Sequence, residues 1–249
     1  MSETRCPHCQ GEMIANTRFC SSCGFHIEVV APQAEDAKPF TGLAAVMALY
    51  FLMLVVCGYL KFVPHVASFE LLETSVLAIS GIILVFAFSN RKELFPILFN
   101  KNIRWWLLPL VALGAVAANI GISQLVEFIN PLNAKLFRPY MYEDTTHPLM
   151  WSILNIAIQP ALFEEITFRG MMHNHLQRTM GITEAMVVTS LLFAVLHLSP
   201  ISFLWLFPFG FLAAWLRKRS GHLWYGIVFH FCFNLTFILT AAMERGWLK

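Results

Sequence analysis

The chain has 249 residues, of which 57% are hydrophobic and only 13% are charged. Soluble domains carry roughly 25% charged residues, so this composition excludes an ordinary soluble protein and indicates a lipid environment. The formal net charge of +2 is too small to indicate a nucleic-acid partner. Residues 1–40 are polar and show no secretory signal peptide, and the first long apolar run starts near Leu43.

Two Cys-x-x-Cys pairs occupy the amino-terminal segment, residues 1–27. This spacing predicts a zinc ribbon, because four thiolates form a closed tetrahedral structural site. The segment is too short to fold on a hydrophobic core, so the bound zinc would stabilise it. Two disulfides are the alternative, which an intracellular location disfavours. The ribbon is also a candidate docking module for a protein partner. The predicted ligands are Cys6, Cys9, Cys20 and Cys23.

A linker rich in proline, alanine and acids follows at residues 28–40, and residues 41–249 form the predicted membrane domain. Most of its apolar runs approach the ~20 residues that a membrane-spanning helix needs. The sequence therefore predicts an all-α, polytopic transmembrane bundle of about seven spans. The runs cover residues 43–60, 69–89, 105–128, 148–168, 184–198, 201–216 and 222–242.

Lysine and arginine are distributed unequally between the two sides of this arrangement. Nine lie in the connections after the second, fourth and sixth runs, and five lie on the other side. Since positive charge favours the cytoplasm, we expect a cytoplasmic amino terminus, which keeps the predicted zinc thiolates reduced. The expected location is the bacterial inner membrane. The nine are Arg91, Lys92, Lys101, Arg104, Arg169, Arg178, Arg217, Lys218 and Arg219, and the five are Lys61, Lys135, Arg138, Arg245 and Lys249.

Several ionisable or strongly polar residues lie inside the apolar runs, where such groups are costly and are functional candidates. Glu165 and Arg169 are four residues apart, so they share a helix face and can pair. Glu164 points about 100° away and has no such partner on its own helix. This asymmetry suits a general base, whereas a structural ion-pair cluster would explain Glu165 and Arg169 alone. The candidates are Glu164, Glu165, Arg169, His197, His230 and Asn234.

These candidates are expected to meet at a similar depth in the bundle. Glu164 lies 17 residues before a turn expected at Gly181, and His197 lies 16 residues after it. In an antiparallel hairpin the two therefore lie nearly level. His230 and Asn234 follow a turn expected near Gly221 and share one helix face. Two histidines, a glutamate and an asparagine at one level indicate an active site.

Three short motifs in these runs resemble those of the CAAX-protease and bacteriocin-processing family. EEITFR at 164–169 matches EExxxR, FAVLH at 193–197 matches FxxxH, and HFCFN at 230–234 matches HxxxN/D. The resemblance covers roughly residues 100–240, with the motifs within 160–235. It implies an intramembrane endopeptidase acting on peptide or membrane-protein substrates. In this scheme Glu164 and His197 activate water, His230 and Asn234 form an oxyanion site, and Glu165 and Arg169 support it.

Two other functions remain open at this stage. Glutamate with two histidines is a known zinc ligand set, so Glu164, His197 and His230 could hold a catalytic metal. However, the chain contains no HExxH motif, which favours the metal-independent mechanism. A membrane scaffold or transporter with a ligand-binding polar cluster is the second alternative, and a peptide-cleavage assay would separate it from a protease.

Overall fold

The computed structural model describes residues 4–5, 9, 12–13, 39–62, 69–99, 103–129, 142 and 145–247, which divide into two units, Met1–Lys38 and Pro39–Lys249. In the first unit, strands β1 (Thr4–Arg5) and β2 (Glu12–Met13) pair antiparallel, with Thr4 opposite Met13. Cys9 is exposed between them. Cys6, Cys20 and Cys23 lie outside the described residues, so the zinc ribbon stays a prediction.

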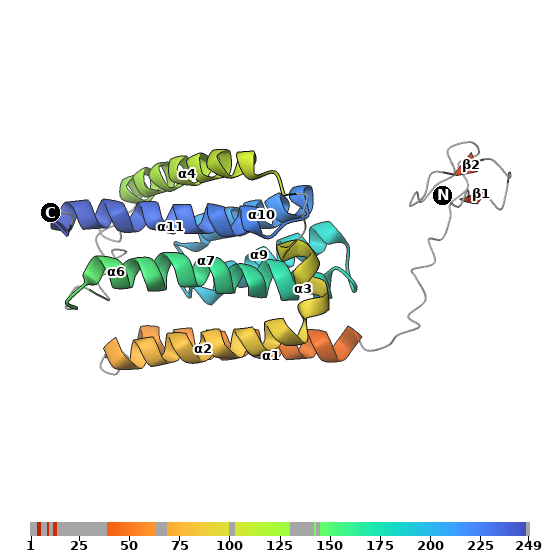
Figure 1. The fold of residues 1–249 in the computed structure, drawn as a ribbon, viewed down its shortest axis with the longest axis horizontal. Coiled ribbons are helices and arrows are strands. Elements are labelled where there is room, and N and C mark those ends of the chain that lie inside the picture. Colours follow the sequence, from red (N-terminus) through yellow and green to blue (C-terminus); the bar gives the residue numbers. More distant parts are fainter. Residues whose placement is uncertain are drawn as a thin grey trace. The chain divides into compact units, whose positions relative to one another are not determined.

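The described part of the second unit is helical, as the sequence predicts, and a helix occupies each of the predicted apolar runs (Figure 1). Two of its segments, η3 and η4, are π-helical. In chain order the elements are α1 (Pro39–Phe62), α2 (Phe69–Ser89), α3 (Arg91–Leu98), η1 (Trp105–Leu107), α4 (Leu108–Ile129), α6 (Pro148–Ser152), η3 (Ile153–Ile158), α7 (Gln159–Glu164), η4 (Glu165–Met172), α8 (His173–Leu176), α9 (Ile182–Leu196), α10 (Phe203–Ser220) and α11 (Trp224–Arg245).

In the described part of the chain, four helices are long and apolar enough to cross a membrane: Gly42–Phe62, Phe69–Ser89, Trp105–Phe128 and Trp224–Arg245. Large apolar side chains such as Leu77 and Phe128 are exposed on their surfaces, where lipid would cover them. These features are those of an integral membrane protein. α9 is a shorter apolar helix, and the number of spans stays a prediction.

The segment from Pro148 to Leu176 is one continuous helical path, longer than the predicted run at 148–168. Figure 1 shows it running between the α1–α2 layer and the layer formed by α4 and α11, and its contacts with both layers agree. Its η4 segment lies at the centre of the hydrophobic core, since Phe168, Met171 and Met172 are fully buried. α4, in contrast, packs chiefly on α11. The first charged motif therefore lies on the most enclosed helix of the domain.

The turns expected at Gly181 and Gly221 are confirmed. Gly181 precedes α9 in an extended conformation, and Gly221 ends α10 with a positive φ of 71°. The short helix α3 was not predicted, because its basic sequence resembles a connection. Leu223 donates its backbone N–H to the carbonyl of Ile97 (3.0 Å), so the α10–α11 turn holds the end of α3.

Candidate active site

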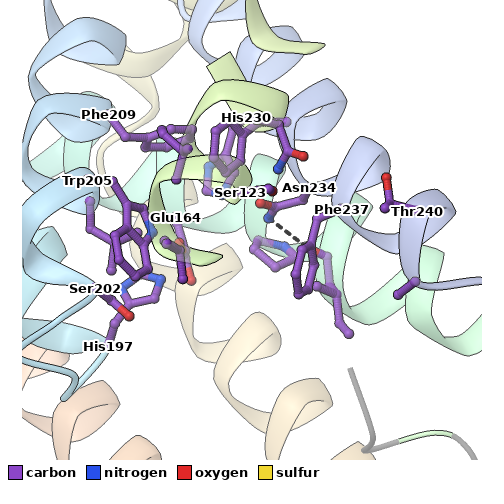
Figure 2. Close-up of a pocket in the computed structure, with 18 of the residues that line it drawn as sticks. Ser123, Glu164, His197, Ser202, Trp205, Phe209, His230, Asn234, Phe237 and Thr240 are labelled. Carbon is purple, nitrogen blue, oxygen red and sulfur yellow. Dashed lines mark hydrogen bonds between the residues drawn. The ribbon is translucent and has the colours of Figure 1, made fainter. Parts of the chain in front are cut away.

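A cavity of about 400 Å³ opens within the helical domain, between α4, the η3–α7 segment, α10 and α11 (Figure 2). The side chains that the sequence assigned to water activation and to the oxyanion site all line it, although they come from three separate helical regions. The predicted convergence is therefore confirmed for Glu164, His197, His230 and Asn234.

Glu165 and Arg169 lie behind the cavity wall rather than on it. Both side chains are fully buried, and Arg169 Nη1 donates to Glu165 Oε1 at 3.0 Å, which confirms the pairing predicted from their spacing. Arg169 Nη2 donates to the carbonyl of Gly210 at 3.1 Å, and its guanidinium lies 4.4 Å from the Phe193 ring centroid. The pair thus joins the η4 segment to α9 and α10.

Glu164 is placed differently from its neighbour. Its side chain is half-buried on the cavity wall, and its buried Oε2 has no hydrogen-bond partner among the described residues. A buried carboxylate oxygen without a partner is costly, so its position favours contact with water or a ligand in the cavity. In Figure 2 Glu164 and His197 are drawn on the same side of the cavity.

The imidazole of His197 is oriented by its own helix. Nδ1 lies 2.9 Å from the carbonyl oxygen of Phe193, one turn earlier. Because a carbonyl only accepts, Nδ1 carries the proton, and Nε2 of the neutral ring keeps its lone pair. The Phe193 ring packs against this imidazole with centroids 4.9 Å apart. His197 can therefore accept a hydrogen bond through Nε2.

A residue that the sequence reasoning missed holds the end of this helix. Lys61 at the end of α1 donates from Nζ to the carbonyls of His197 (3.0 Å) and Leu198 (2.9 Å). Leu198 has a φ of 51°, a left-handed conformation unusual for a leucine. A cation at a helix carboxyl terminus satisfies unpaired carbonyls and favours the helix dipole. Because 136 residues separate Lys61 from His197, no local pattern could have linked them.

His230 connects the cavity to the buried ion pair. Its side chain is 4% exposed, and Nδ1 donates to Glu165 Oε1 at 3.1 Å. Phe209 packs edge-on against the imidazole, with centroids 5.0 Å apart. Glu165 Oε1 therefore accepts hydrogen bonds from both Arg169 and His230, which adds a contact that sequence spacing did not indicate.

Asn234 is held by the backbone of the neighbouring π-helical segment. Its Nδ2 donates to the carbonyl of Ile156 at 2.7 Å. An amide nitrogen has two hydrogens, so one remains for a ligand. π-helical turns are rare and frequently occur at functional sites. Here η3 supplies the carbonyl that orients a cavity-lining amide.

Two glycines allow the helices to approach the buried pair closely. A Cβ on Gly226 would lie 2.8 Å from Glu165 Oε2, and one on Gly210 would lie 3.0 Å from Arg169 Nη2. Small residues that let helices approach are common in membrane bundles, so glycines within apolar runs were a usable signal. Other polar residues line the cavity and were also missed: Asn119, Ser123, Glu127, Asn155, Ser202, Thr240 and Glu244.

Residues 146–236 match the family model described as Type II CAAX prenyl endopeptidase Rce1-like. The matched segment contains the three motifs and therefore all six candidate residues, from Glu164 to Asn234. The match supports the family resemblance and, with it, a protease that acts in the membrane. No curated protein and no solved structure matches the chain.

The alternative reading of the cavity is a metal site formed by Glu164, His197 and His230. Within the described ranges, no three His, Cys, Asp or Glu side chains are grouped so that they could hold a metal ion. Glu164, His197 and His230 share a cavity, but they do not form such a group. The metal-independent mechanism stays a prediction.

Proposed function

We propose that this protein is an intramembrane endopeptidase that hydrolyses peptide bonds with a water molecule activated by Glu164. The observation that carries the proposal is the difference between the adjacent carboxylates. Each acid has one buried oxygen without a partner among the described residues, but only Glu164 lines the cavity, which it shares with His197 and Asn234. Glu165 lies behind the cavity wall, where its other oxygen accepts from Arg169 and His230. A general base must have a free acceptor within reach of the proton that it abstracts.

In the proposed first step, Glu164 takes a proton from water while His197 Nε2 accepts a hydrogen bond from the other water hydrogen. The Nδ1–H bond to Phe193 supports this assignment, because it leaves Nε2 as the acceptor. The resulting hydroxide attacks the carbonyl carbon of the scissile bond. Glu164 then returns the proton to the leaving amine nitrogen as the C–N bond breaks, which gives a carboxylic acid and an amine.

The oxyanion formed in that attack would be stabilised by Asn234 and His230. The second Nδ2 hydrogen of Asn234 can donate to it, because Ile156 takes only the first. His230 can donate from Nε2 as the imidazolium, since its Nδ1 already donates to Glu165. Preorganised donors in a site shielded from water are an effective form of transition-state stabilisation.

Several finer assignments belong to this proposal and rest on the sequence. We propose about seven spans, an amino terminus in the cytoplasm of a bacterial cell, and a peptide or membrane-protein substrate. We also propose one structural zinc bound by Cys6, Cys9, Cys20 and Cys23. Metal analysis of the full chain in detergent should give one zinc per chain. Cys6→Ser combined with Cys9→Ser should remove it without abolishing peptide cleavage; full zinc retention would contradict the ligand assignment.

Cleavage by purified Glu164→Gln protein in detergent tests the catalytic proposal. The change removes the base but keeps the side-chain shape, so activity should fall at least ~100-fold while thermal unfolding stays unchanged. Glu184→Gln, at an exposed position in the first turn of α9, is the matched control and should retain activity. An active Glu164→Gln enzyme would contradict the proposed role of Glu164.

A further inference from the structure

Three polar residues form a stripe along α4 that the proposed mechanism does not use. Asn119, Ser123 and Glu127 follow one another at intervals of four residues, and all three line the cavity. They lie within the candidate membrane span Trp105–Phe128, where polar side chains are costly and are usually retained for a function. This polar stripe of α4 therefore indicates a ligand-binding surface.

Asn119 gives the clearest indication of that ligand. Its side chain is only 4% exposed, and it borders the cavity. Since the amide borders the cavity and offers both a donor and an acceptor, it suits a group with the polarity of a peptide bond.

The spacing of the polar stripe matches the backbone of an extended peptide. Four residues of α-helix rise about 6 Å. In an extended chain, groups that point to the same side recur every second residue, at about 6.5 Å. Asn119 and Ser123 can therefore contact successive backbone groups on one edge of an extended segment. Glu127, about 12 Å along the helix from Asn119, would lie roughly four residues further along that segment.

The charge of the cavity indicates which side chain the substrate carries at that end. The described lining includes the carboxylates of Glu127 and Glu164 and contains no lysine or arginine. Glu127 is exposed at the end of the stripe, so an incoming group can reach it. Such a cavity attracts a cationic group and repels a carboxylate, and this complementarity provides selectivity.

We propose that the polar stripe of α4 binds an extended segment of the substrate through its backbone, with Glu127 selecting a basic side chain over an acidic one. This inference rests on the proposed function, because it assumes that the cavity receives a peptide. It adds the substrate class: a segment that is extended at the site and carries a lysine or arginine about four residues from the contact with Asn119.

Binding of peptides to full-length Glu164→Gln protein in detergent tests the inference without requiring turnover. The probes are fluorescent peptides with capped ends that differ only in carrying one lysine or one glutamate. We expect the lysine peptide to bind about fivefold more tightly, as for an accessible ion pair worth about 1 kcal/mol. Glu127→Lys in the same background should reverse the preference. Glu70→Lys, at an exposed glutamate of α2 that does not line the cavity, should leave it unchanged.

The backbone contacts are tested in the same assay by Asn119→Leu and Ser123→Ala. Each should weaken both peptides about equally, by about fivefold, because backbone recognition does not depend on the side chain. Gln124→Ala, at an exposed neighbour outside the lining, should have no effect. Equal effects of Ser123→Ala and Gln124→Ala would overturn the inference, as would an unchanged charge preference in Glu127→Lys or no binding of either peptide.

The outcomes also separate this inference from the proposed function. Loss of cleavage in Glu164→Gln, together with a charge preference that Glu127→Lys does not change, would support the proposed protease function and contradict the inferred substrate class. Retained cleavage in Glu164→Gln, together with a charge preference that Glu127→Lys reverses, would contradict the catalytic role of Glu164 and support the substrate class.

Discussion

Glu164 and Glu165 are neighbours in sequence, but they belong to two regions built in different ways. The cavity wall, formed by Glu164, His197 and Asn234, leaves hydrogen-bonding capacity facing an open space. The buried cluster of Glu165, Arg169 and His230 bonds its members to one another and to Gly210, and its two atoms without a described partner, Glu165 Oε2 and Arg169 Nε, belong to residues that do not line the cavity. Two adjacent acids can therefore have different tasks: one carboxylate stays available in the cavity, while the other fixes the helices around it.

The largest expected effect on stability is in the buried cluster. Glu165→Gln leaves Arg169 as a buried charge without its carboxylate, and breaking a buried pair costs roughly 3–5 kcal/mol. Thermal unfolding in detergent should show a large loss, and peptide cleavage should fall with it. Glu164→Gln is the natural control, because it should unfold like the wild type. Equal destabilisation by both changes would erase the distinction between the two regions.

A change that touches neither acid should also report on the cluster. The Cβ of Gly226→Ala would lie 2.8 Å from Glu165 Oε2, and this carboxylate cannot move without straining its bonds to Arg169 and His230. Overpacking of this kind typically costs about 1–3 kcal/mol. Gly114→Ala is the control, since no described atom beyond its chain neighbours and its own helix backbone lies within 4 Å of its added Cβ. Unfolding measurements that rank the two alike would show that the cluster is loosely packed.

The smallest expected effect concerns the cavity wall. Lys61→Met removes the cation that holds the carbonyls of His197 and Leu198, an interaction worth about 1 kcal/mol at a helix terminus. We expect kcat to fall about fivefold with little change in KM, because His197 is misplaced rather than removed. Lys61→Arg should restore most of the activity.

Lys218→Met is the matched control for Lys61, since Lys218 donates to Thr183 Oγ1 (3.4 Å) at the opposite end of the same helix. An equal loss of kcat in both variants would show that Lys61 supports α9 generally and does not position His197.

Local spacing made part of this site predictable. Glu165 and Arg169 are one helical turn apart, so their pairing follows from the sequence, and turn glycines fixed the relative depths of Glu164 and His197. The bond between His230 and Glu165 joins residues 65 positions apart and required the packed structure. The partner of Asn234 is a backbone carbonyl, which no side-chain pattern can indicate. α3 escaped prediction because its eight residues are shorter than the window in which helical periodicity is measured.

The π-helical segment η3 changes which residues of the helical path from Pro148 to Leu176 share one face. Nine residues of regular α-helix turn through about 900°, which would leave Asn155 on the side opposite Glu164. Both nevertheless line the same cavity, since a π turn takes more residues to close. A helical wheel drawn on the sequence therefore misplaces every residue before Gln159.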